Sequence, residues 1–311
     1  MTKTLRANLL LLLTAFIWGI AFVAQDVAMD TMEPFTFNAA RTLVAALALL
    51  PCIRFLDRLN QKRGDSSATA SRKFADMTPA QKRTLLLGGL CCGAALFVGS
   101  SFQQLGIRET SAGKAGFVTA LYIVLVPLSG LFFKRSVRRN VWLAVALCTA
   151  GLFLLCVTDA LTVGPGDLYL LLCAVAFTVH ILVIDHFSPQ TDCVRMSCLQ
   201  FLVASALCAT VMLFTEHPTF ASLLRGWAPI LYAGVLSGGM GYTLQMVAQR
   251  DTEPTVASLL MCLESVFAVL AGWVLLGDML TVRELSGCAL MLVGIVLAQL
   301  PARGKRQLPA A

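Results

Sequence analysis

The chain has 311 residues, of which 58% are hydrophobic and only 13% are charged, and its mean hydropathy is +0.78. A soluble domain carries about 25% charged residues, so this composition argues against an ordinary soluble protein. The formal net charge is +7. The cations lie at the ends of apolar segments, where they set membrane orientation, so the charge is not interpreted as a nucleic-acid-binding surface.

Ten stretches of mostly apolar sequence run from Leu5 to Leu300, each close to the roughly 20 residues that a helix needs to cross the bilayer. Helices are expected because lipid offers no partners for backbone N–H and C=O groups. The expected spans are 8–28, 33–53, 84–106, 111–133, 140–158, 166–186, 195–215, 227–248, 254–276 and 284–300. The one sizeable polar stretch, Leu56–Arg83, is too short and too polar to build a core. Within it, Thr78-Pro79-Ala80-Gln81 predicts a helix start.

The distribution of basic residues predicts the orientation. If the N-terminus is cytoplasmic and the spans alternate, 19 of the 24 Lys and Arg residues fall in inside segments and 4 in outside segments, and Arg41 lies within a span. Cytoplasmic loops carry an excess of Lys and Arg, so both termini are expected in the cytoplasm. The first span could instead be a signal peptide, but it continues through Phe22 and Val23 without a clear cleavage site.

The second half of the chain echoes the first, in the same order. The matches are Leu43-Val44-Ala45 with Leu202-Val203-Ala204, Gly93 with Gly234, Gln104 with Gln245, Ala146-Leu147 with Ala289-Leu290, and Gly151 with Gly294. Each half holds five spans, and because five is odd the second half must enter the membrane from the opposite side. The sequence therefore predicts an inverted-topology repeat, a recurrent plan of secondary transporters.

Two charged residues lie deep within apolar spans, where a charge costs about 2.5–3.5 kcal/mol on insertion scales. Glu264 is near the middle of the span 254–276, and is either a substrate or proton site in a cavity or a structural carboxylate. Arg41 either binds an anionic group or pairs with Glu264 or Asp26 to hold the helices together. Asn38 lies one turn before Arg41 on the same helix face.

Several uncharged groups are further candidates for the site. His180 lies deep in its span, and is either a proton carrier or a hydrogen-bonded core residue. Gln104 and Gln245 occupy matching positions in the two halves and can bind a polar ligand or bond across helices. Trp18 and Tyr122 can stack on an organic solute or simply pack in the core.

Nothing in the sequence indicates a cofactor or a metal. The 11 cysteines include no Cys-x-x-Cys pair and lie mostly within apolar spans, so disulfides and metal ligation are not expected. There is no ATP-binding Gly-x-x-x-x-Gly-Lys loop, no His-Glu-x-x-His and no Gly-x-Ser-x-Gly motif. An enzyme is therefore not expected.

Three stretches of the chain have a distinctive pattern: Ala15-Phe16-Ile17-Trp18-Gly19 with Phe22-Val23-Ala24, Thr110-Ser111-Ala112-Gly113-Lys114-Ala115-Gly116-Phe117 with Pro127, and Leu263-Glu264-Ser265-Val266-Phe267-Ala268 followed by Gly277-Asp278. In these stretches the chain resembles the EamA-like members of the drug/metabolite transporter superfamily. Arg41 matches a frequent arginine of the second helix. Ser265 stands where proline is usual, which puts a helix kink there in doubt, and Asp278 replaces the usual glutamate.

The resemblance implies a ten-helix carrier with a central cavity, built from repeats at 1–159 and 160–301 with a cytoplasmic tail at 302–311. The fifth and tenth helices would lie at the periphery. Members of the family move amino acids, metabolites, nucleotide sugars or drugs, often outward in bacteria, and specificity does not follow from the fold.

We therefore expect a secondary transporter in the bacterial inner membrane. It would export a small polar or amphipathic metabolite by alternating access, with protons as a candidate coupling ion. Its partners would be the lipid bilayer and a small solute, with no nucleic acid. The alternatives are a membrane-embedded enzyme and a scaffold or sensor subunit without flux. The oligomeric state, the substrate and the direction are left open.

Overall fold

The computed structural model describes residues 3–63, 74–109, 112–132, 134, 137–156, 164–271, 273–274 and 281–300. The described residues are overwhelmingly helical. The long helices are α1 (Lys3–Met29), α2 (Pro34–Arg63), α3 (Pro79–Glu109), α6 (Arg139–Cys156), α7 (Pro165–Phe187), α8 (Cys193–Thr215) and α14 (Val282–Gln299). Short helices are η1 (Phe74–Asp76), η2 (Ser188–Gln190) and α9 (Phe220–Arg225).

The remaining helical segments are interrupted. The range 111–133 holds α4 (Ala112–Thr119) and α5 (Tyr122–Phe132), and the range 254–276 holds α12 (Pro254–Met261) and α13 (Glu264–Ala271). The range 227–248 holds α10 (Trp227–Leu231), a π-helical segment η3 (Tyr232–Tyr242) and α11 (Thr243–Gln249). These three expected spans are therefore irregular helices, and two of them still hold a segment long and apolar enough to cross a membrane, at Ala115–Phe132 and Pro254–Ala271. The glycines of η3, which favour no backbone conformation strongly, explain part of the difference there.

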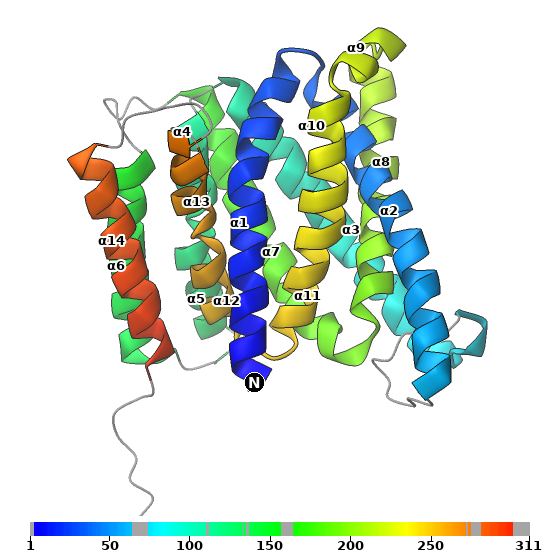
Figure 1. The fold of residues 1–311 in the computed structure, drawn as a ribbon, viewed down its shortest axis with the longest axis horizontal. Coiled ribbons are helices and arrows are strands. Elements are labelled where there is room, and N and C mark those ends of the chain that lie inside the picture. Colours follow the sequence, from blue (N-terminus) through cyan, green and yellow to red (C-terminus); the bar gives the residue numbers. More distant parts are fainter. Residues whose placement is uncertain are drawn as a thin grey trace, which may run out of the picture.

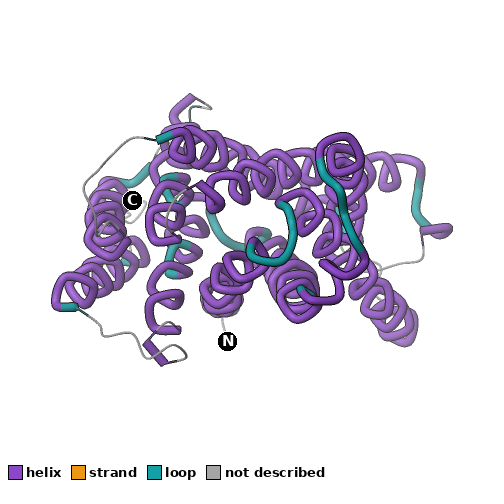
Figure 2. Tube along the Cα trace, turned by 90° about the horizontal axis from the view of Figure 1, so that it is seen from above, coloured by secondary structure: helices purple, strands orange, loops and turns teal. Residues whose placement is uncertain are grey.

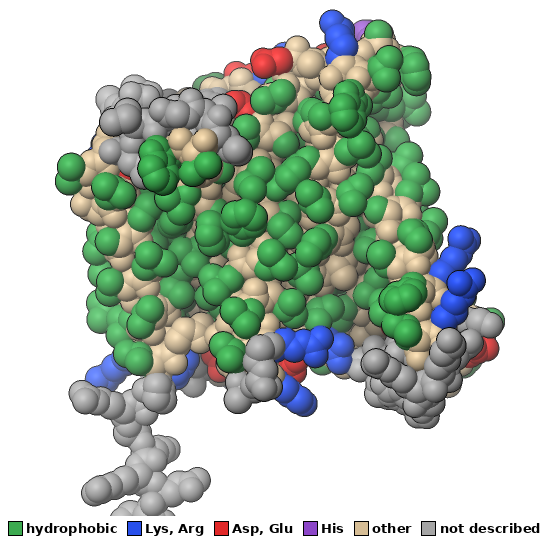
Figure 3. All heavy atoms as spheres, viewed as in Figure 1, with side chains coloured by type: hydrophobic (Ala, Val, Ile, Leu, Met, Phe, Trp, Pro, Cys, Tyr) green, Lys and Arg blue, Asp and Glu red, His purple; other side chains and the backbone are tan. Residues whose placement is uncertain are grey.

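Among the described residues, eight helical segments are long and apolar enough to cross a membrane, and each overlaps one of the expected spans; the helix at Arg139–Leu155 is apolar but shorter. Figure 1 shows the long helices packed roughly parallel or antiparallel to one another. Figure 2, a view along the helices, shows that the bundle is elongated in cross-section. On the face in Figure 3, apolar side chains cover the middle, and most of the basic side chains gather at one end. The chain is thus an all-α, multi-pass membrane protein.

The helix ends follow the local sequence. The expected start at Thr78 is confirmed, because Thr78 and Gln81 form a reciprocal pair of hydrogen bonds at the start of α3 (2.9 and 3.3 Å). Asp192 accepts hydrogen bonds from the first-turn N–H groups of α8. The linker residues 64–73 lie outside the described residues, as do Gly277, Asp278 and the tail at 302–311.

The helices α2 and α8 pack along their length through contacts that occur twice. At one end, the Glu216 carboxylate accepts hydrogen bonds from the backbone N–H groups of Phe35 and Thr36 (2.8 and 2.7 Å). At the other end, Arg195 forms an ion pair with Asp57. Arg195 follows Thr36 in the chain by the same number of residues as Glu216 follows Asp57, so Thr36 corresponds to Arg195 and Asp57 to Glu216. The two contacts therefore use corresponding positions with the two helices exchanged.

The same spacing relates a second pair of contacts between these helices. The Ser205 hydroxyl donates to the Ala39 carbonyl (3.1 Å), and the Cys198 thiol donates to the Ala46 carbonyl (3.6 Å). A methyl group on Gly93 would lie 2.8 Å from the Gln200 carbonyl oxygen, and one on Gly234 would lie 2.9 Å from that of Arg41. These are close approaches that only glycine permits without a shift.

The helices α6 and α14 lie side by side at one edge of the bundle (Figure 1), as the resemblance implies for the fifth and tenth helices. Their contacts also occur twice. A methyl group on Gly151 would lie 2.7 Å from the Gly287 carbonyl oxygen, and one on Gly294 would lie 3.0 Å from that of Ala144. Gly151 is as far from Gly294 in the chain as Ala144 is from Gly287.

The two chain ends that the structure describes meet at one end of the bundle. The Asn8 side chain in α1 donates a hydrogen bond to the Gln299 side chain in α14 (2.9 Å). The start of α1 and the end of α14 therefore lie at the same membrane face.

Candidate functional site

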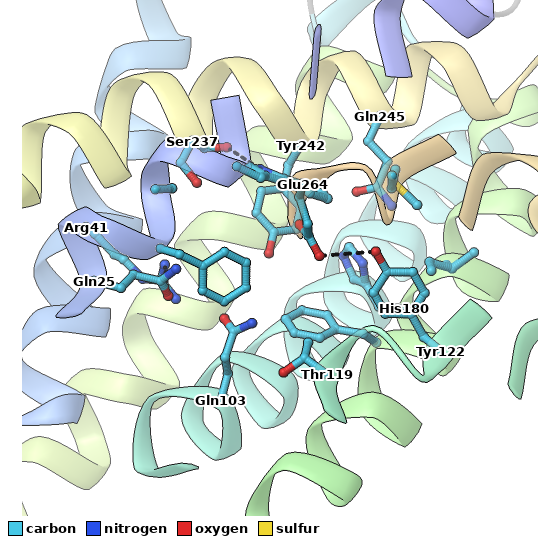
Figure 4. Close-up of a pocket in the computed structure, with 16 residues that line it drawn as sticks. Gln25, Arg41, Gln103, Thr119, Tyr122, His180, Ser237, Tyr242, Gln245 and Glu264 are labelled. Atoms are coloured by element: carbon cyan, nitrogen blue, oxygen red, sulfur yellow. Dashed lines mark hydrogen bonds between the residues drawn. The ribbon is translucent and has the colours of Figure 1, made fainter. Parts of the chain in front are cut away.

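A polar pocket lies in the middle of the bundle. Its charged and polar lining side chains come from α1, α2, α3, α4, α5, α7, η3, α11 and α13 (Figure 4). They are Trp18, Gln25, Arg41, Gln103, Thr119, Tyr122, His180, Ser237, Tyr242, Gln245 and Glu264. The cavity volume is about 50 Å³. This space suits a few water molecules or a compact polar group in this conformation.

The pocket lies beside the two helix interruptions. Tyr122 is the first residue of α5 and Glu264 is the first residue of α13. The Tyr122 hydroxyl donates a hydrogen bond to Glu264 Oε1 (3.2 Å), and both residues are buried. The interruption before Glu264 occurs without a proline at 265, so the doubt over a kink raised by Ser265 is resolved in favour of a break. Broken helices are frequent at transporter binding sites.

Arg41 carries a buried positive charge held by neutral partners. Its Nε donates to Asn38 Oδ1 (2.8 Å), its Nη1 donates to Gln25 Oε1 (3.2 Å), and its guanidinium carbon lies 5.2 Å from the centre of the Phe37 ring. Among the described residues, no carboxylate lies within ion-pair distance of it. The expected pairing of Arg41 with Glu264 or Asp26 is therefore not present, and Asp26 is exposed.

Two of the eight candidate residues lie behind the pocket. Asn38 donates to the Ser100 carbonyl (3.0 Å) while accepting from Arg41, and Gln104 donates to the Gln25 carbonyl (3.3 Å). Neither lines the pocket. Each bonds to a residue that lines the pocket: Asn38 to the side chain of Arg41, and Gln104 to the backbone of Gln25.

His180 and Gln245 line the pocket and come from the second half of the chain. His180 Nε2 is 3.0 Å from Gln200 Oε1, which makes a hydrogen bond with the ring. Gln245 is almost fully buried, and its Oε1 has no hydrogen-bond partner in the described residues. Figure 4 shows the Gln245 amide directed toward the pocket. A buried acceptor without a partner is costly, so a bound donor would be stabilising there.

An aromatic wall connects α1 with the π-helical segment. The indole N–H of Trp18 donates to the Ser237 carbonyl (3.1 Å), and the Trp18 ring lies 4.7 Å from that of Tyr242. Tyr242 also meets His180 and Phe201 edge to face. Such rings can pack on the apolar part of a solute.

Six of the eight predicted residues thus line one pocket: Trp18, Arg41, Tyr122, His180, Gln245 and Glu264. The sequence analysis did not single out several other polar or aromatic lining residues, among them Gln25, Gln103, Thr119, Phe177, Ser237 and Tyr242. Gln103 and Gln104 are adjacent, and in a helix without a strong apolar face nothing in the sequence selects one over the other.

A second, larger cavity lies between the pocket and the end of the bundle where α14 ends. Its volume is about 460 Å³. Arg138, which lines it, donates hydrogen bonds to the Ala298 and Leu300 carbonyls, so this cavity lies at the end of the bundle where α14 ends. Tyr122 lines the pocket and Val126 lines the cavity, so about one helical turn separates the two along α5.

Several relatives match this chain over most of its length. An uncharacterized transporter from Archaeoglobus fulgidus is 29% identical over 96% of this chain and 87% of its own length. The uncharacterized transporter YwfM from Bacillus subtilis is 24% identical over 98% and 97% of the two chains. A WAT1-related chloroplastic protein from Arabidopsis thaliana is 22% identical, over 92% and 67%.

One solved crystal structure has the same fold, with a TM-score of 0.74 and 17% sequence identity over 94% of this chain and 96% of that one. The sequence profile of the EamA-like transporter family matches residues 5–157 and again residues 164–300. These two matches cover nearly the whole chain, so the protein belongs to the EamA-like transporter family and is a membrane transporter.

Proposed function

We propose that the chain is a secondary transporter that exports a small polar or amphipathic metabolite, such as an amino acid or a drug-like solute, across the bacterial inner membrane. The observation that carries this proposal is the small polar pocket between the two halves, one helical turn from an open cavity at one end. A carrier needs a binding site that opens to one side at a time. This arrangement suits a state that opens toward the end holding Lys3 and Leu300.

The proposed mechanism is alternating access by two inverted five-helix repeats, 1–159 and 160–301. The twofold recurrence of contacts in the α2–α8 and α6–α14 pairs supports it, because corresponding positions exchange roles across each pair. The paired interruptions before Tyr122 and Glu264 support it as well. Two similar halves related in this way can exchange conformations and so open the pocket to the other side.

The chemistry of the pocket favours a solute with both a donor and an acceptor group. Arg41 offers guanidinium N–H groups on one side, and Glu264 with Gln245 offers oxygen acceptors on the other. The aromatic rings of Trp18 and Tyr242 would pack on the apolar part of the solute. Glu264 is the group we assign to proton coupling, since it is the carboxyl that lines the pocket.

The orientation we propose places both termini in the cytoplasm. The excess of basic residues on one side in the sequence and the Asn8–Gln299 contact support it. Cysteine labelling at Ser67 and at Gly304 should then succeed from the same face of the cell membrane. Labelling of these two positions from opposite faces would contradict the inverted repeat.

The direct test is flux in liposomes containing the purified protein, measured with a panel of radiolabelled amino acids, amines and carboxylates. We expect at least one solute to be moved, and Glu264→Gln to abolish its accumulation and its dependence on a pH gradient. Asp26→Asn, which removes an exposed carboxylate, is the matched control and should leave the flux unchanged. Retained pH-driven accumulation in Glu264→Gln would remove the coupling role.

A further inference from the structure

A shallow apolar groove runs along the face of α6 that lies toward α4 and α5. It is lined by Phe117 of α4, Val124 of α5 and, along α6, by Trp142, Ala146, Ala150 and Phe153. The opposite face of α6 is buried against α14. The groove lies apart from the central pocket, since the two share no lining residue.

The groove has the dimensions of a single lipid chain. Ala146 and Ala150 are one turn apart and form its floor, while the larger Trp142 and Phe153 stand at its two ends. These two residues are separated by 11 positions of a continuous helix, which is about 16 Å at roughly 1.5 Å per residue. The hydrocarbon core of a bilayer is about 30 Å thick, so the groove is about one leaflet long.

A cation stands at one end of the groove. The Arg283 guanidinium carbon lies 5.8 Å from the centre of the Phe153 ring, and that ring meets the Phe117 ring edge to face at 5.9 Å. Arg283 is exposed and lies in the first turn of α14, at the end of the bundle opposite Lys3 and Leu300. An exposed guanidinium at a helix end in a membrane protein is at the depth of the lipid phosphates.

We propose that this groove binds an anionic phospholipid, whose phosphate pairs with Arg283 and whose acyl chain lies over Ala146 and Ala150 as far as Trp142. The apolar walls exclude water as a stable occupant, and the length fits one chain. The fork of the guanidinium matches phosphate oxygens, and its positive charge favours a headgroup of net negative charge over a zwitterionic one. This site follows from membrane embedding and is independent of the solute and the direction of transport.

The test uses Trp142 as a reporter, because bromine atoms on an acyl chain quench a nearby indole. A protein in which Trp18, Trp227 and Trp273 are replaced by Phe retains Trp142 alone and is reconstituted with chain-brominated phosphatidylglycerol diluted in unbrominated phosphatidylcholine. The reverse mixture holds brominated phosphatidylcholine in unbrominated phosphatidylglycerol. One basic residue near the surface gives about a fivefold preference for an anionic lipid. We therefore expect brominated phosphatidylglycerol to reach half-maximal quenching at about one fifth of the brominated fraction that brominated phosphatidylcholine needs.

Two variants and a control make the test specific. Arg283→Gln should remove the headgroup preference, and Ala150→Leu should fill the groove and weaken quenching by both lipids. A second reporter protein keeps only Trp227, an exposed residue at the start of α10. Arg225 lies two residues before it and can give a lipid preference of its own, but that preference should be unaffected by Arg283→Gln.

Equal quenching of Trp142 by both brominated lipids would overturn the proposal. Quenching of Trp142 that is unchanged by Ala150→Leu would overturn it too, with thermal melting confirming that the variant is folded. Protection of Trp142 from both lipids, together with a dimeric mass in detergent, would mean that a second copy of the chain covers the groove, and would also overturn it.

Discussion

The two halves of the chain agree in their framework and differ in their pocket. Gly93 and Gly234 approach α8 and α2 at corresponding positions, and the backbone carbonyls that they approach belong to Gln200 and Arg41. The side chains of those two residues are different: Gln200 bonds to His180, and Arg41 bonds to Asn38 and Gln25. The packing is repeated, and the chemistry is not.

The two interrupted helices show the same contrast. Each begins again at a residue that faces the pocket, but in the first half that residue is Tyr122 and in the second it is Glu264. The tyrosine hydroxyl donates to the carboxylate, so the two different residues complete one contact. A duplicated scaffold can acquire a polar site in this way without changing its helix packing.

The largest effect is expected where the halves differ in charge. Arg41→Gln makes the position match Gln200 and removes the only arginine in the pocket lining. A hydrogen bond to a charged group contributes up to about 3 kcal/mol, so the affinity for a solute with an acceptor group should fall by about two orders of magnitude. Binding of the transported solute to purified protein measures this. Arg225→Gln, an exposed arginine in α9, is the control.

Unchanged affinity in Arg41→Gln, with the melting temperature retained, would show that Arg41 supports the helices and does not meet the solute. A loss of folding in Arg41→Gln would be separated from a loss of binding by Arg41→Lys. This change keeps the charge but cannot make the same fork of donors.

The second prediction concerns the shared framework. Gly93→Ala and Gly234→Ala each place a methyl group within 3 Å of a backbone carbonyl oxygen and of a valine side chain on the neighbouring helix. Overpacking of this kind costs about 2 kcal/mol, and the two variants should lose similar stability because their surroundings correspond. Gly116→Ala is the control, since its methyl group would meet only Ser265 Oγ at 4.0 Å. Unfolding free energies in mixed micelles would decide the matter, and a loss in only one half would break the correspondence.

The third prediction sharpens the contrast at the interruptions. Tyr122→Phe removes only the hydroxyl that donates to Glu264 Oε1. Loss of a hydrogen bond to a carboxylate costs about 1.5 kcal/mol, so solute affinity should change by about tenfold in a variant that still folds. Tyr232→Phe is the matched control, because that hydroxyl donates to the Ile17 carbonyl and does not line the pocket. Equal effects of the two changes would remove the special role of Tyr122.

Hydropathy was sufficient to predict the helical segments, because lipid demands long apolar helices wherever the chain crosses. Lone polar residues in those segments were a good guide to the pocket. Arg41, His180 and Glu264 all line it, since a polar group in a membrane protein avoids the lipid.

The sequence could not predict the rotation of each helix or its irregularities. Gln103 lines the pocket and Gln104 does not, a difference of one position on an apolar helix. The π-helical turns of η3 place Ser237 and Tyr242 on one side of the segment, where a regular helix would set them apart. No proline stands directly before or after Glu264, so the sequence does not indicate the helix break there.

The smallest expected effect tests whether the two ends of the α2–α8 pair are equivalent. Glu216 accepts three hydrogen bonds from neutral groups of Phe35 and Thr36, whereas Asp57 is held by an ion pair with Arg195, and both carboxylates are buried. Glu216→Gln should cost about 1 kcal/mol of unfolding free energy, and Asp57→Asn about half as much. Added salt should reduce the Asp57→Asn effect and leave the Glu216→Gln effect in place, because salt screens an ion pair more than hydrogen bonds from neutral donors. Equal costs and equal salt dependence would mean that the two kinds of contact do not differ in strength, and the two helices would then be held symmetrically.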